Sequence, residues 1–67
     1  MISLADQRAA AQREVRLRKA TYPRLVHQGK MAPEEAEYQT RVMEAIVKTL
    51  HRLDAEQRQL SLFGTGG

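Results

Sequence analysis

Residues 28–35 read Gln28-Gly29-Lys30-Met31-Ala32-Pro33-Glu34-Glu35, and this stretch decides the fold. Gly29 suits the position just after a helix C-terminus, where glycine is favoured because it readily adopts a left-handed backbone conformation. Pro33 suits the first position of a second helix, since the amide hydrogen that proline lacks would have no partner there. Glu34 and Glu35 then complement the positive end of the helix dipole. We therefore expect two antiparallel helices joined by about four residues.

Apolar residues recur at helical spacing on both sides of this turn. Before the turn they form a narrow stripe, made of Leu4, Ala11, Val15, Tyr22 and Val26. After the turn a wider stripe follows the positions Ala36, Met43, Ile46, Leu50, Leu53, Gln57 and Leu60, broadened by Tyr38, Val42 and Val47. Intervals of three, four and seven residues are typical of amphipathic helices, and the alternation that marks a strand is nowhere sustained. The expected fold is all-α: an antiparallel helical hairpin over residues 1–58, followed by a flexible C-terminal tail over residues 59–67.

Pro23 lies inside the first helical segment. Its ring clashes with the carbonyl of Lys19, and it disfavours helical geometry at Tyr22. Two alternatives remain open: a break near Thr21 with a short helix restarting at Pro23, or one helix that continues with a kink. We expect a kinked or briefly interrupted first helix.

The apolar stripe of the second segment is wider than the stripe of the first segment can cover. A chain of 67 residues buries only about 60 % of the surface that its unfolded form exposes. Cysteine is absent, so no disulfide can compensate for a small core. We therefore expect self-association, in which a second copy closes the core as a four-helix arrangement.

The net charge of +3 is unevenly distributed. Residues 1–30 carry seven basic and two acidic residues, whereas residues 31–67 carry four basic and six acidic ones. This asymmetry indicates either an anionic partner or a basic helix beside an acidic one. The candidate nucleic-acid contacts all lie in the first segment: Arg13, Arg16, Arg18, Lys19 and Arg24. They wrap around the helix, and only Tyr22 offers a ring for base stacking there, so we expect weak phosphate contact with DNA at most, and no sequence readout.

Several other classes of function are not expected. The longest apolar run is Ala45–Val47, far short of the ~20 residues of a membrane span. The first residues lack the basic start and the apolar stretch of a signal peptide. We therefore expect a cytoplasmic protein. His27 and His51 lie on different helices without a set of acidic ligands, so no metal site is expected. No nucleophile and base can be paired, and so small a hairpin should offer no ligand-sized cavity. We expect no cofactor, no small-molecule substrate and no enzymatic activity.

The segment Gln59-Leu60-Ser61-Leu62-Phe63 resembles the pentapeptide, written Gln-Leu-Ser/Asp-Leu-Phe, by which proteins bind the bacterial β sliding clamp. All five positions match, and average residue usage makes a chance match in such a chain roughly a one-in-ten-thousand event. The resemblance implies that Leu62 and Phe63 anchor in an apolar pocket of the clamp and that Leu60 fills an adjoining depression. It also implies that Gln59 hydrogen-bonds the pocket rim and that Ser61 faces solvent. Because the resemblance covers five residues, it implies a partner but no fold. Binding to the clamp would also associate the protein with the nucleoid.

A linear motif needs an extended, accessible segment, which the glycines after Phe63 favour. Alternatively, Leu60 continues the stripe of the second helix while Leu62 and Phe63 fold back to cap the open end of the hairpin. In that case the chain is a basic helical nucleic-acid-binding protein with a structural C-terminus. Residues 18–31 and 43–46 also resemble short uncharacterised proteins of phage and proteobacterial genomes, a likeness that implies no activity.

Overall fold

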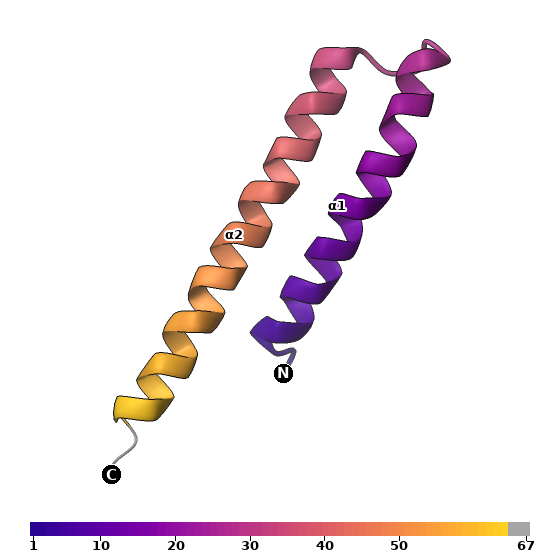
Figure 1. Cartoon of the computed structure of the whole chain (residues 1–67). Helices are drawn as coiled ribbons and strands as arrows, with labels where there is room; N and C mark the ends of the chain where they lie inside the picture. The colour runs from indigo at the N-terminus through magenta and orange to yellow at the C-terminus, as the bar shows by residue number, and fades with distance from the viewer. Residues whose placement is uncertain (65–67) are drawn as a thin grey trace.

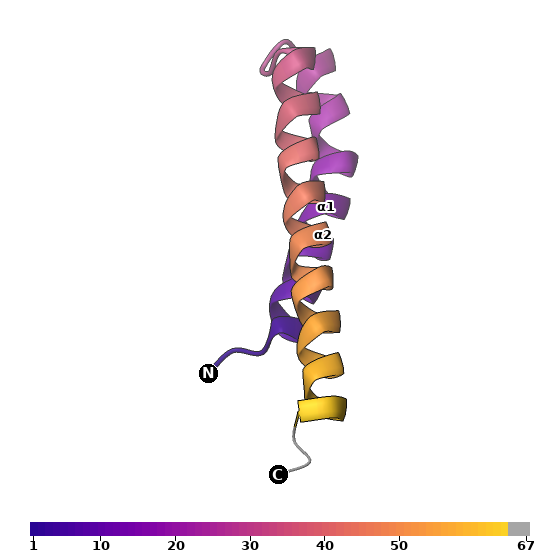
Figure 2. The same ribbon diagram turned by 90° about the vertical axis from the view of Figure 1, so that its left-hand side faces the viewer.

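The structure is a computed structural model that describes residues 1–64, with the backbone alone for residues 63 and 64. It contains two α-helices, α1 (Leu4–His27) and α2 (Pro33–Gly64), and no strand among the described residues. The helices lie antiparallel and side by side (Figure 1). In the perpendicular view of Figure 2 they overlap along most of their length, so the hairpin is a single layer. The expected all-α helical hairpin is confirmed.

Side-chain and backbone caps define the start of α1 and the turn. Ser3 precedes α1, and its Oγ accepts a 3.0 Å hydrogen bond from the amide of Asp6. At the other end Gly29 has φ +73°, the left-handed conformation expected of it. Its N–H donates to the carbonyl of Val26 (3.0 Å), and the N–H of Lys30 donates to that of Leu25 (2.9 Å). This pair of bonds is the Schellman motif, so the prediction of a helix end before Gly29 is confirmed.

α1 is continuous across Pro23, so the alternative of a break near Thr21 is wrong. Tyr22, Pro23 and Val26 line a groove together with residues of α2. Tyr22 and Val26 are partly buried, whereas Pro23 is exposed. Proline costs the helix a hydrogen bond to the carbonyl four residues back, but on an exposed side water can satisfy that carbonyl. Burial of the flanking side chains therefore holds the last turn of α1 in place.

The side chains that pack between α1 and α2 form a seam with a seven-residue repeat. In α1 the least exposed positions of this seam are Leu4, Arg8, Ala11, Val15, Arg18, Tyr22 and Val26. In α2 they are Ala36, Thr40, Met43, Val47, Leu50 and Asp54. Spacings of three and four residues are those of a coiled-coil seam. The predicted stripe of α1 is thus confirmed, and two arginines fill the seam positions between its apolar residues.

The seam does not use all the apolar surface of α2. Ala36, Met43 and Leu50 face α1, but Ile46 and Leu53 remain 41 % and 40 % exposed. Ala11, at 7 % exposure, is the most buried apolar residue among those described. The prediction that α1 cannot cover the apolar face of α2 is therefore confirmed.

Ion pairs across the seam join the basic helix to the acidic one. Arg8 Nη1 lies 3.2 Å from Asp54 Oδ2 and 3.0 Å from His51 Nδ1. Near the middle of the hairpin, Lys19 Nζ lies 3.0 Å from Glu44 Oε2. These contacts agree with the interpretation of the charge asymmetry as a basic helix beside an acidic one.

α2 extends past the start of α1. Asp54 lies opposite Arg8, near the first turn of α1, and the side chains of residues 55–62 are all exposed. Figure 1 shows this end of α2 projecting beyond the N-terminus of the chain. Residues 59–64 are helical, so the structure differs from the expected tail beginning at residue 59; residues 65–67 lie outside the described part. The reason is that no helix breaker occurs between Pro33 and Gly64, while alanine, leucine, glutamine and arginine favour the helix.

Candidate functional site

The clamp-like pentapeptide occupies the projecting end of α2. Leu60 is 69 % exposed and Leu62 is 80 % exposed. The alternative in which leucines of this segment fold back to cap the hairpin is therefore wrong for Leu62, and Leu60 does not pack against α1 either. The side chain of Phe63 lies outside the described part of the chain. Because successive helical residues are 100° apart, Leu60 and Leu62 point to nearly opposite sides of α2.

The projecting segment, residues 55–64, has little to hold it in helical form. The side chains of residues 55–62 are exposed, and the last turn carries no basic residue to complement the negative end of the helix dipole. The last carbonyls of any helix also lack intrahelical partners. These residues extend a helix that is already formed, and without tertiary packing the end of a helix is only marginally stable in water. This end of α2 can therefore unwind at small cost without disturbing the seam.

The five candidate nucleic-acid contacts divide into two groups. Arg18 is held within the hairpin: its Nε donates to Glu14 Oε1 and its Nη1 donates to the carbonyl of Gln39, each at 2.9 Å. The Arg18 guanidinium also lies 5.9 Å from the ring centroid of Tyr22, and Lys19 pairs with Glu44. The side chains of the other three are exposed and make no ion pair or hydrogen bond within the described part of the chain: Arg13, Arg16 and Arg24. Only these three are available to a phosphate backbone.

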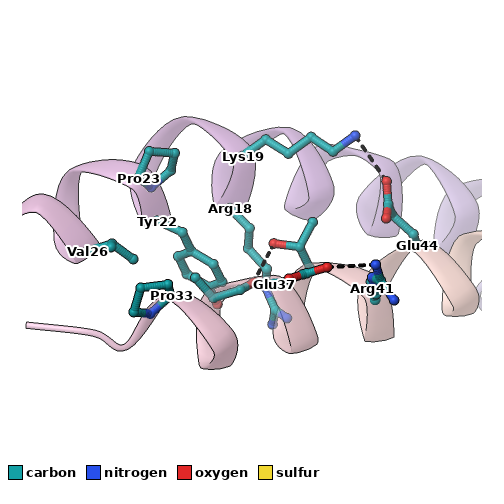
Figure 3. A pocket seen from close by; sticks show the side chains of 11 residues that line it. Arg18, Lys19, Tyr22, Pro23, Val26, Pro33, Glu37, Arg41 and Glu44 are labelled. Atoms are coloured by element: carbon teal, nitrogen blue, oxygen red, sulfur yellow. Dashed lines mark hydrogen bonds and ion pairs between the residues drawn. The ribbon is translucent and has the colours of Figure 1, made fainter.

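An open groove of about 520 Å³ runs between the helices near the turn (Figure 3). Its apolar lining comes from Tyr22, Pro23, Val26, Pro33 and Ala36. Charged pairs form its rim, Lys19 with Glu44 and Arg41 with Glu37 (2.6 Å). The groove is largely open to solvent and is not an enclosed cavity, so the expectation that the hairpin offers no ligand-sized cavity stays a prediction.

The histidines and acidic residues do not assemble a metal-ligand set. Over residues 1–64, no group of three or more histidine, cysteine or acidic side chains is placed to hold a metal ion. His51 instead shares its Nδ1 with Arg8. In the same range neither helix is both long and apolar enough to cross a membrane.

No protein-family model matches this chain, and neither a curated protein nor a solved structure shows significant similarity to it. A function therefore has to be inferred from the residues and their placement. The segment with the most specific pattern is the pentapeptide, residues 59–63, and the structure presents it at the least supported end of the hairpin.

Proposed function

We propose that this protein binds the bacterial β sliding clamp through residues 59–63 and acts, without catalysing a reaction, as a replication or repair accessory factor or as a clamp modulator. One observation carries the proposal: a pentapeptide that matches the clamp-binding pattern at every position lies at the projecting end of α2, where the side chains up to Leu62 are exposed. The hairpin then serves as a scaffold, and the end of α2 serves as the ligand.

Binding requires the end of α2 to unwind. In the helix Leu60 and Leu62 point in nearly opposite directions, whereas an extended segment brings alternate side chains to one side. Unwinding residues 59–64 breaks a few terminal helix hydrogen bonds and none of the contacts in the seam. Only unwound molecules bind, so the apparent affinity equals the intrinsic affinity multiplied by the fraction of free molecules whose helix end is unwound.

The expected affinity follows from the anchors. Two or three apolar side chains buried in the clamp contribute roughly 1.5–3 kcal/mol each. Ordering the peptide and unwinding the helix end offset part of this gain. Only the upper end of this range corresponds to an equilibrium dissociation constant on the order of micromolar, and we expect binding no tighter than that.

The test is a titration of the full chain with purified clamp, followed by calorimetry or fluorescence anisotropy. Leu62→Ala/Phe63→Ala should weaken binding by about 30-fold or more, because loss of an anchor side chain typically costs 2 kcal/mol or more. The matched control is Gln57→Ala/Arg58→Ala, in the same exposed segment but outside the pentapeptide, and it should bind like the wild type. Helix content by circular dichroism should stay nearly constant in both variants, since Gln57, Arg58 and Leu62 are exposed.

Two outcomes contradict the proposal. The first is a wild-type chain that does not bind the clamp at concentrations of 100 times the expected micromolar constant. The second is equal loss in the control variant. A gel-shift with DNA at low and moderate salt tests the nucleic-acid alternative: retardation that Arg16→Glu/Arg24→Glu abolishes, together with no clamp binding, favours the basic helical protein.

A further inference from the structure

The two open sides of the hairpin differ in character. One side carries the groove near the turn and a second groove beside it, and it is charged, with Arg16, Lys19, Glu37, Arg41, Glu44 and Lys48 along it. A smaller groove, lined in part by Leu17 and Thr21, lies on the opposite side. At 100° per residue, the opposite side presents a different set, which we call the apolar side: Leu17 and Thr21 of α1 with Val42, Ile46 and Leu53 of α2. Leu17 belongs to neither predicted stripe, and it is 56 % exposed.

The exposed area of the chain is larger than a stable single copy needs. The hairpin exposes 5375 Å², whereas a compact folded protein of 7.6 kDa exposes about 4,300 Å². The excess, about 1,100 Å², exceeds the roughly 800 Å² that each partner contributes to a standard interface. The radius of gyration, 16.3 Å, likewise exceeds the about 11 Å of a compact chain of this length.

Charge favours a second copy as the partner on the apolar side. The ionised groups at the middle of this side are Glu14 and Arg18, and they neutralise each other at 2.9 Å. By the same rotation Glu35, seven residues before Val42, and Arg24, seven residues after Leu17, also lie towards this side. One is acidic and the other basic, so the net charge of this side is close to zero and two identical surfaces do not repel. The charged side, in contrast, is already lined with pairs such as Lys19 with Glu44 that are satisfied within one copy.

We propose that the apolar side is the interface between two copies of this chain, which meet about a two-fold axis to form a four-helix bundle. Leu17, Ile46 and Leu53 become core residues, and the seven-residue step from Ile46 to Leu53 supplies a second seam on α2 beside the one that faces α1. An interface about a two-fold axis uses the same patch on both copies, so it covers the apolar side without any other component. The interface does not include the pentapeptide and holds whether or not the clamp is the partner of that segment.

The first test is the molar mass in solution, measured by light scattering at about 10 and 200 µM. The wild type should have twice the mass of the 7.6 kDa chain at the higher concentration. Ile46→Glu/Leu53→Glu should have the mass of one copy, because two carboxylates would be buried unpaired in the interface. The matched control is Lys48→Glu, two residues from Ile46 on the charged side, and it should remain dimeric.

Disulfide trapping gives an independent measurement if the double glutamate variant fails to fold. The natural chain has no cysteine, so single cysteines report proximity directly. After mild oxidation, at least one of Leu17→Cys, Ile46→Cys and Leu53→Cys should form a covalent dimer in high yield, and Lys48→Cys should not. A wild type with the mass of one copy at 200 µM would overturn the proposal. So would the absence of a covalent dimer from all three apolar-side cysteines, or equal yields from Lys48→Cys.

Discussion

Asp54 occupies a position of the seam where an apolar residue would normally pack. It is 6 % exposed, and its Oδ2 lies 3.2 Å from Arg8 and 3.3 Å from Arg58, although neither contact has the geometry of a hydrogen bond. A buried carboxylate needs a cationic partner, and Arg8 on α1 meets it in one register of the two helices only. The pair therefore fixes the alignment of α1 on α2 near the open end of the hairpin.

Replacing Arg8 should destabilise the hairpin more than replacing Arg58. Arg8→Met leaves Asp54 with one exposed partner and should lower the free energy of unfolding by about 1–2 kcal/mol. Arg58→Met removes a side chain that is 67 % exposed and should cost less than about 0.5 kcal/mol. Arg8→Leu/Asp54→Leu should be as stable as the wild type or more so, because an apolar pair fits the seam. Urea denaturation measures all three, and a double variant no better than Arg8→Met would show that the charges are not the determining feature.

Arg18 shows why the sequence alone did not identify the available basic residues. Its charge places it with Arg13, Arg16 and Arg24, but its position, three residues after Val15 and four before Tyr22, places it at the seam. There it bonds Glu14 and the carbonyl of Gln39. A long arginine side chain can line an apolar seam while its head reaches a polar partner, so charge is a poor guide to exposure in a helix this short of leucine.

At the scale of the helices, the sequence predicted where they begin and end at the turn more reliably than where α2 ends. Gly29 and Pro33 are local signals, and both act as expected. The end of α2 has no comparable signal before Gly64, and the pentapeptide pattern favoured an extended segment where the structure has helix. The sequence also did not predict which apolar residues of α2 face α1. Ile46 and Val47 are adjacent in sequence, and only the packing of α1 on α2 makes Val47 the one that is partly buried.

Amide hydrogen exchange should divide α2 into two parts. Residues 36–54 lie along the seam, whereas the side chains of residues 55–62 are exposed. We expect the amides of residues 57–62 to exchange at least tenfold faster than those of residues 42–50, because local opening there breaks no tertiary contact. Uniform protection along α2 would contradict the view that its end unwinds cheaply. Such a result would also weaken the proposed mode of clamp binding without bearing on the dimer.

At the scale of the whole molecule, the two proposed surfaces lie on different parts of the chain. The apolar side lies along the middle of the hairpin, and the pentapeptide lies on the end of α2 that projects beyond it. A dimer therefore carries two copies of the pentapeptide. If the ring-shaped clamp offers one pocket on each of its two halves, both copies can engage at once, and the second contact benefits from a raised effective concentration.

The stability of the hairpin should depend on protein concentration. With Ala11 as the one buried apolar residue among those described, a single copy has little core to offset the entropy lost when about 60 residues become ordered. Folding coupled to dimerisation gains about 1.4 kcal/mol per dimer for each tenfold rise in concentration. The midpoint of thermal unfolding should thus rise by about 5 °C per decade of concentration, as measured by circular dichroism between 5 and 500 µM. Ile46→Glu/Leu53→Glu should show a lower midpoint that does not change with concentration, whereas Lys48→Glu should follow the wild type. A concentration-independent midpoint for the wild type would mean that the thin seam between α1 and α2 is sufficient to fold one copy alone.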